Sequence, residues 1–212
     1  MRRALAALTA ITVVGLIPAP ANAATVTLSA GHVDILDIDY ANSALTLDVL
    51  DGTGATDVDR PASDVILQVP ATAKVTVPSG TAWSFLGTAG DTVWVLPQTQ
   101  QAGLLYAGWN TLGVPSGAVQ SDSVNVRLTG VTGPGRFSTY TTGSFGTPSK
   151  SFDSGDGLPD TLTVARNSHA HANWAFSAAG TYTVTFEVTA QLATTGATVT
   201  SGPTAYTFTV LN

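Results

Sequence analysis

The sequence predicts an all-β protein, an immunoglobulin-like β-sandwich with an elaborated, loop-rich middle region. Short segments alternate apolar and polar residues with a period of two, and Gly or Pro separates them at short intervals. Helical periodicity is almost absent, whereas Thr and Val, which favour strands, are abundant. Near the end of the chain, Gly180-Thr181-Tyr182 precedes a strand, as in the tyrosine corner of immunoglobulin-like sandwiches.

The first 23 residues are typical of a secretory signal peptide. Arg2 and Arg3 precede an apolar run over residues 4–17, and Ala21-Asn22-Ala23 is a small-x-small cleavage site. The apolar run is too short to cross a bilayer and ends at Pro18. We therefore predict a protein that is secreted after removal of residues 1–23, with residues 24–212 forming a single β-sandwich domain.

The first predicted strands contain a change of phase. A short strand over Val26–Leu28 is followed by a longer one whose apolar positions shift by one residue, which predicts a β-bulge near residues 35–36. Its apolar residues are Val33 and Ile35, then Leu36, Ile38 and Tyr40. A turn at residues 41–43 leads into a strand through Leu45, Leu47 and Val49, so these two strands form a hairpin.

The remaining strands follow from short apolar or alternating segments. Their expected ranges are 65–69, 75–77, 83–86, 93–96, 124–128, 137–141, 162–176, 181–188 and 206–210. Loops or turns are expected at 51–61, 97–113, 143–148, 153–157 and 194–196. The second of these loops is aromatic, with Tyr106 and Trp109.

Charge and cysteine content restrict the partners. Removal of the two N-terminal arginines changes the net charge from −6 to −8, which argues against nucleic acid and anionic lipid and favours cations. The chain has no cysteine, so burial and strand pairing must stabilise an exported fold without disulfides. Any metal site must therefore use nitrogen and oxygen ligands.

Two of the three histidines stand together in the segment over residues 168–176. On a strand, His169 and His171 point to one face with their backbones about 6.5–7 Å apart. Both rings can then reach one metal ion at about 2.0–2.1 Å. Two polar histidines on a solvated face are the alternative. We predict that the fold brings His32, far upstream, to the same ion.

Two further residues are candidates for this site. Asp34 shares the strand face of His32 unless the bulge intervenes, and is a fourth ligand, a partner that orients His32, or a surface carboxylate. Asn173 follows His171 on the same predicted face and either bonds a bound ligand or caps the strand. Neutral imidazoles are required, so affinity should fall below about pH 6.5.

Other constellations favour no further chemistry. The acidic loop at residues 153–157 lacks the spacing of an EF-hand, and the sequence LPQTQ at 96–100 differs from a sortase signal at its last residue. No Gly-x-Ser-x-Gly elbow occurs, and the only glutamate is Glu187. We therefore expect no enzyme. Trp83, Trp94, Tyr106 and Trp109 either stack on sugars or belong to a β core.

Several segments together resemble a family of exported proteins. They are Gly31-His32-Val33-Asp34, residues 93–100, Gly108-Trp109, Tyr140-Thr141-Thr142-Gly143, and residues 169–176 with Gly180-Thr181-Tyr182. The chain resembles the actinobacterial surface-anchored protein domain of the "choice-of-anchor M" type, and its histidine segment is similar to a wall-associated repeat of actinobacteria. The resemblance covers essentially all of residues 24–212, and HAHANWAF is its most specific part.

The resemblance implies a role in metal transport. Such domains occur in exported proteins associated with metal-type ABC transporters, including the substrate-binding subunit. It implies zinc or manganese as the substrate, motif histidines at His32, His169 and His171, and transfer of the metal towards an importer. Family members often carry an anchor, whereas this chain stops at Asn212, which implies a freely secreted form or one held at the surface by a partner.

We therefore predict a secreted protein that binds a divalent transition metal, zinc first and manganese or copper as alternatives, through His32, His169 and His171. Its expected role is extracellular metal capture or relay to an ABC importer. A carbohydrate- or wall-binding module that uses Tyr106 and Trp109 is one alternative. A passive surface or adhesion domain is the other.

Overall fold

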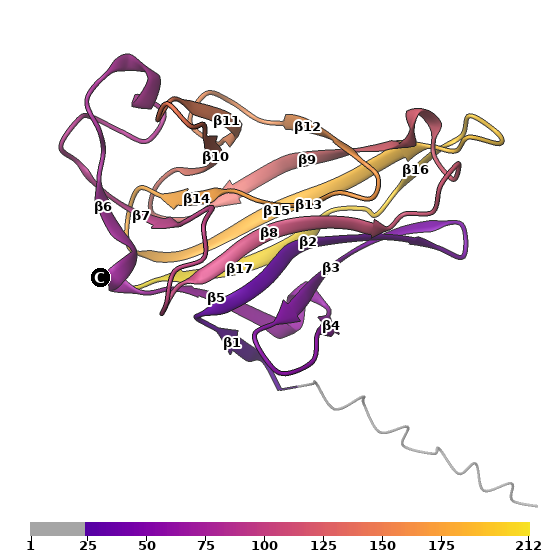
Figure 1. Ribbon diagram of the computed structural model, residues 1–212, viewed down its shortest axis with the longest axis horizontal. Coiled ribbons are helices and arrows are strands. Elements are labelled where there is room, and N and C mark those ends of the chain that lie inside the picture. Colours follow the sequence, from indigo (N-terminus) through magenta and orange to yellow (C-terminus); the bar gives the residue numbers. More distant parts are fainter. Residues whose placement is uncertain (1–23) are drawn as a thin grey trace, which may run out of the picture.

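The computed structural model describes residues 24–212, and these form an all-β sandwich of 17 strands in three sheets (Figure 1). The predicted signal peptide, residues 1–23, lies outside the described residues. Four short 3-10 turns interrupt the strands: η1 (Ala62–Asp64), η2 (Ala71–Ala73), η3 (Thr81–Trp83) and η4 (Gln120–Asp122). Within residues 24–212 no helix has the length and apolar character needed to cross a membrane.

The sheets are defined by their strand order. The long sheet contains, in spatial order, β1 (Val26–Leu28), β5 (Val65–Val69), β17 (Thr204–Val210), β15 (Gly180–Gln191), β9 (Ser123–Thr132) and β12 (Asp160–Ala165), with β16 (Thr198–Thr200) beside β15. The histidine sheet contains β13 (His169–His171), β8 (Leu105–Gly113), β2 (Gly31–Ala41), β3 (Ala44–Gly52) and β4 (Val58–Arg60). The third sheet contains β11 (Pro148–Asp153), β10 (Phe137–Thr142), β14 (Asn173–Phe176), β7 (Thr92–Leu96) and β6 (Lys74–Thr76).

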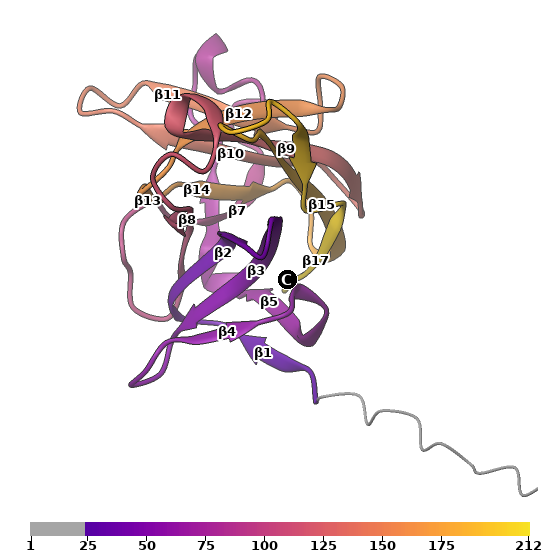
Figure 2. The same ribbon diagram turned by 90° about the vertical axis from the view of Figure 1, so that its right-hand side faces the viewer.

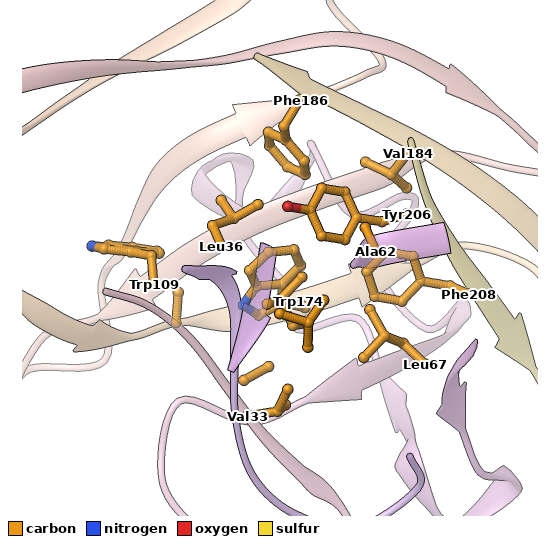
Figure 3. Packing of buried hydrophobic residues seen from close by; sticks show 14 of the residues in the cluster. Val33, Leu36, Ala62, Leu67, Trp109, Trp174, Val184, Phe186, Tyr206 and Phe208 are labelled. Carbon is orange, nitrogen blue, oxygen red and sulfur yellow. The ribbon is translucent and has the colours of Figure 1, made fainter. Parts of the chain in front are cut away.

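One apolar core joins the three sheets. In the view turned by 90°, β15 and β17 of the long sheet lie on the right, across from β2 and β8 of the histidine sheet and β14 and β7 of the third sheet (Figure 2). Between them pack Leu36 from the histidine sheet, Trp174 from the third, and Phe186 and Phe208 from the long sheet (Figure 3). All four are fully buried, so they contribute about 1.5–3 kcal/mol each to the hydrophobic stabilisation.

The phase change in β2 is a β-bulge, as predicted. The register of β2 against β3 shifts between Asp34 and Asp37, and both Ile35 and Leu36 are buried in the core. The bulge adds one residue to β2 relative to β3. Asp34 and Asp37 therefore point to the same face of the sheet although they are three positions apart. The predicted hairpin is also present: Asn42 and Ser43 both have positive φ, as a two-residue turn of type I′ requires.

The predicted loop over residues 97–113 is wrong in its second half. Leu105–Gly113 is strand β8, which pairs in parallel with β2 and antiparallel with β13. Most of its residues are buried, so they do not show the alternation of a half-exposed strand. This strand lies between the two histidine-bearing strands and fixes their spacing.

Smaller differences concern segment type. Residues 83–86 belong to η3 and the turns after it rather than to a strand. Strand β4 occupies part of the predicted 51–61 loop, and β11 begins at Pro148, the last residue of the predicted turn. The Tyr182 hydroxyl donates a hydrogen bond of 3.0 Å to the Ala178 carbonyl, four residues upstream. The immunoglobulin-like topology itself stays a prediction.

The segment over residues 168–176 forms two strands instead of one. Strand β13 ends at His171, and β14 begins at Asn173 in a different sheet. Ala172, Trp174 and Phe176 lie in the core, as their alternation predicts. The change of sheet at Ala172 separates Asn173 from the histidines, so the shared face predicted for the three residues is wrong.

Candidate metal centre

Three strands of the histidine sheet position the candidate site. His32 and Asp34 lie on β2, and His169 and His171 lie on β13. Strand β8 separates them, with Gly108 paired with both Asp34 and His171. The two histidine-bearing segments are 137 residues apart in sequence at their closest contact, yet they share one face of one sheet.

The three imidazole rings form a nearly equilateral triangle. The ring centroids of His32 and His169 are 5.2 Å apart, and those of His171 are 5.1 Å from both. One donor atom from each ring and one Asp34 oxygen lie within 4.8 Å of one another. The predicted meeting of histidines from opposite ends of the chain is therefore present, and Asp34 joins them.

The distances suit a tetrahedral ion. Ligand atoms about 2.0–2.1 Å from such an ion are about 3.3–3.4 Å apart, and three ligating imidazoles have centroids about 5.2 Å apart. The Nε2 atoms of His32 and His169 are 3.1 Å apart, and they lie 3.5 and 3.1 Å from Asp34 Oδ1. The cluster could therefore hold a metal ion with three nitrogens and one oxygen.

The Asp34 carboxylate lacks any other partner. It is fully buried, and apart from the His32 and His169 ring nitrogens near Oδ1 neither of its oxygens has a hydrogen-bond partner. A buried polar group in a native protein almost always has a partner, and an unpaired charge is especially costly. Since the neighbours of Asp34 Oδ1 are imidazole nitrogens, a shared cation would satisfy both the carboxylate and the rings.

Burial sets the protonation of the metal-free cluster. Desolvation raises the pKa of Asp34, although His169 and His32 oppose the rise. Desolvation and the nearby rings of His32 and His169 lower the pKa of His171 to about 4. At neutral pH the His171 ring is therefore uncharged, which is the form that ligates metals.

Two glycines leave room for the rings. A Cβ on Gly52 would lie 2.5 Å from His32 Nδ1, and a Cβ on Gly108 would lie 2.7 Å from His171 Nδ1 and 2.5 Å from the Ala170 carbonyl oxygen. Tyr106 packs on His171, because its ring stacks on the imidazole at a centroid distance of 3.5 Å and an angle of 11°. Two cross-strand glycines thus leave room for the His32 and His171 rings, and one stacked tyrosine packs against His171.

Asn173 belongs to a different polar cluster. Its side-chain oxygen accepts a bond of 3.0 Å from the Gln98 backbone, and its amide nitrogen donates to Gln98 Oε1 at 2.9 Å and to the Tyr140 carbonyl at 3.2 Å. These bonds tie the segment after β7 to β10 and β14. The amide is engaged there, so the predicted role of Asn173 beside the histidines gives way to a structural one.

The aromatic residues proposed for sugar stacking are engaged as well. Trp109 is buried in the core, and Trp94 is also buried, with its indole nitrogen donating to the Leu211 carbonyl. Tyr106 stacks on His171. Trp83 is partly exposed and packs against Phe85 and Tyr140. The sequence did not indicate the contact of Tyr106 with His171, because the prediction placed Tyr106 in a loop.

A scan against models of known protein families finds no match, and no curated protein matches the sequence. The histidine sheet is thus the part of the molecule that bears on its function.

Proposed function

We propose that this protein is a secreted binding protein for a divalent transition metal, with zinc as the first choice, held by His32, His169, His171 and Asp34. The observation that carries the proposal is the convergence of three imidazoles on a fully buried carboxylate without hydrogen bonds. Burial penalises the charge of such a carboxylate, and a cation shared with the rings would offset that penalty.

The donor set favours zinc. Three imidazole nitrogens with one carboxylate oxygen suit the tetrahedral shell of Zn²⁺, and imidazole also suits copper. Manganese prefers more oxygen ligands in an octahedral arrangement, so it ranks third. Because the chain itself supplies four ligands, the site resembles closed binding sites more than catalytic ones, which keep a position for water. We therefore propose binding without catalysis.

The biological role that suits such a site is capture or relay of metal outside the cell. The signal-peptide pattern at residues 1–23 supports secretion, and the family resemblance supports transfer to an ABC importer or its binding subunit. Access also fits, because the side chains of His169 and His32 are 41% and 26% exposed. A metal can therefore reach the site without unfolding of the sheet.

Isothermal titration calorimetry on chelator-treated residues 24–212 tests the proposal. We expect one zinc ion per chain, tighter binding of zinc and copper than of manganese, and at least a hundredfold weaker zinc binding in His171→Ala. Tyr106→Phe is the matched control, because it keeps the ring that stacks on His171 and should bind zinc like the wild type.

Two results would contradict the proposal. Wild-type protein that binds none of the three metals would remove the function, and a His171→Ala variant with unchanged affinity would remove the site. Circular dichroism of each variant before titration separates a lost ligand from a lost fold.

A further inference from the structure

Beside the histidines, strands β2, β3 and β4 carry four more carboxylates on the same sheet face. The bulge at residues 35–36 turns Asp37 and Asp39 to the face that already holds His32 and Asp34, while Val33, Ile35, Leu36 and Ile38 point into the core. On β3, Asp48 is the direct cross-strand partner of Asp37. On β4, Asp59 pairs with Leu50, which in turn pairs with Asp34. We call Asp37, Asp39, Asp48 and Asp59 the acidic track.

The carboxylates of the acidic track are close enough to repel one another. Burial, followed by repulsion from Asp39, Asp59, Asp34 and Asp48, raises the pKa of Asp37 to about 7. The pKa values of Asp39 and Asp48 are raised by burial and by Asp59. Repulsion of this kind costs stability, so the fold bears an energetic penalty for placing these carboxylates together.

No basic residue neutralises the acidic track. Among residues 24–212, none of its four members takes part in an ion pair. Arg60 lies on the same strand as Asp59, but its guanidinium binds Asp51 at 2.8 Å. Because no ion pair neutralises it, the negative potential of the track can attract dissolved cations.

The acidic track is not a second coordination site. Within the described part of the chain, the one group of three or more His and Asp donors within 4.8 Å of one another is that of His32, Asp34, His169 and His171. The track lies beside it in the sheet and meets it at Asp34, whose buried oxygens have no hydrogen-bond partner. Its charges can therefore attract a cation towards Asp34 without ligating it.

We propose that the acidic track guides divalent cations to the histidine site and sets the rate at which they bind. This inference rests on the proposed metal-binding function. Surfaces lined by charges of one sign raise association rates by about 10–10³-fold at low salt, and screening removes the effect as ionic strength rises. The track therefore acts on association, whereas the four ligands determine dissociation.

Stopped-flow kinetics with zinc and a competing fluorescent indicator test this inference. The variant is Asp39→Asn/Asp48→Asn/Asp59→Asn, which leaves Asp34 and the buried Asp37 unchanged. The control is Asp64→Asn/Asp91→Asn/Asp156→Asn, which makes the same change of net charge elsewhere on the surface. We expect the track variant to bind zinc at least fivefold more slowly at about 10 mM ionic strength, with chelator-induced dissociation within twofold of the wild type.

Salt completes the test. The difference in association rate should fall below about twofold at about 0.5 M salt, since exposed charges are then screened. Equal rates for the track variant and the wild type at low salt would overturn the inference, as would an equal loss in the control. A change confined to dissociation would overturn it too, because the track would then ligate the ion.

The two proposals fail in different ways. If the track variant binds zinc with the affinity and the rates of the wild type, the guiding role is wrong. The proposed metal-binding function then still stands. Absence of zinc binding in the wild type removes both. If the triple variant does not fold, Asp59→Asn alone, at an exposed position on the short strand β4, provides the same comparison with Asp64→Asn.

Discussion

Two polar clusters, each with a buried member, lie on either side of Ala172, and these buried members differ in how far their hydrogen bonds are satisfied. On the C-terminal side, the Asn173 amide binds Gln98 and the Tyr140 carbonyl through both its oxygen and its nitrogen. On the N-terminal side, Asp34 is fully buried beside the histidines with neither oxygen in a hydrogen bond. Polar groups buried for stability are normally paired. The difference distinguishes a cluster that is complete by itself from one that a cation would complete.

Adding metal should produce the largest change in stability, because it should complete the cluster around Asp34. At zinc concentrations near 1,000 times the dissociation constant, the free energy of unfolding should rise by about 4 kcal/mol. In His32→Ala the same addition should leave it nearly unchanged. Urea denaturation with zinc or with chelator measures both values. An equal rise in the variant would place the ion outside the histidine cluster.

Loss of the Asn173 amide should lower the stability of the fold but leave zinc binding nearly unchanged. Asn173→Ala removes the partners of Gln98 and of the Tyr140 carbonyl, so the free energy of unfolding should fall by about 2–3 kcal/mol. The folded variant should bind zinc within about threefold of the wild type. Asn125→Ala, which removes one exposed hydrogen bond that Asn125 accepts from the Thr163 hydroxyl, is the control and should cost under about 0.5 kcal/mol. Weaker zinc binding at full stability would instead return Asn173 to the metal site.

A methyl group at Gly108 should disturb the rings directly. Its carbon would lie 2.5 Å from the Ala170 carbonyl oxygen, so β13 or the His171 ring must move. We expect Gly108→Ala to weaken zinc binding about tenfold and to lower the free energy of unfolding by about 1–3 kcal/mol. Gly130→Ala on β9 is matched to it, since the nearest atom to the new carbon there is 3.7 Å away. Calorimetry that finds the two variants alike would remove the steric argument.

The metal-free protein should also weaken in acid through His171. Its pKa in the folded protein is about 4, below the value of about 6.5 expected when unfolded. The unfolded chain therefore binds the proton first, and stability is complete above about pH 6.5 and falls as the pH drops towards 4. Because the ring is partly exposed, we expect about 1–2 kcal/mol. Urea titrations of wild type and His171→Gln with chelator should show a shallower pH slope in the variant.

The smallest expected effect concerns Asp34 itself. Its pKa is raised by burial, so at neutral pH its charge destabilises the metal-free fold. Asp34→Asn should therefore raise the free energy of unfolding in chelator by about 1 kcal/mol while it weakens zinc binding. The isosteric Asn keeps the shape of the side chain. A clear loss of stability in chelator would mean that the carboxylate already has a structural partner.

Much of the site could be predicted from residue pattern alone. Scarcity of histidine and the i,i+2 spacing of His169 and His171 indicated a common ligand face, and the phase change after Ile35 indicated the bulge. Both signals depend on the period-two geometry of a strand, which holds locally. The position of His32 beside the pair followed from the hypothesis of one shared ion.

The rest depends on tertiary context. Strand β8 contains Gly108 within a mostly buried segment, so it lacks the alternation and propensity that mark an exposed strand. Without β8, neither the stacking of Tyr106 on His171 nor the room that Gly108 leaves for the His171 ring could be expected. The predicted role of Asn173 beside the histidines was wrong because β13 and β14 belong to different sheets. The alternation of apolar and polar residues continues through this change of sheet, so the sequence does not indicate it.

The most direct test uses the fact that the chain has only three histidines. Long-range ¹H–¹⁵N spectra of their imidazoles, recorded while chelator-treated protein is titrated with zinc, report on each ring separately. The account predicts that the nitrogen resonances of His32, His169 and His171 all change together and that the change is complete at one zinc per chain. A His32 ring that keeps its metal-free shifts while the other two change would contradict a shared ion.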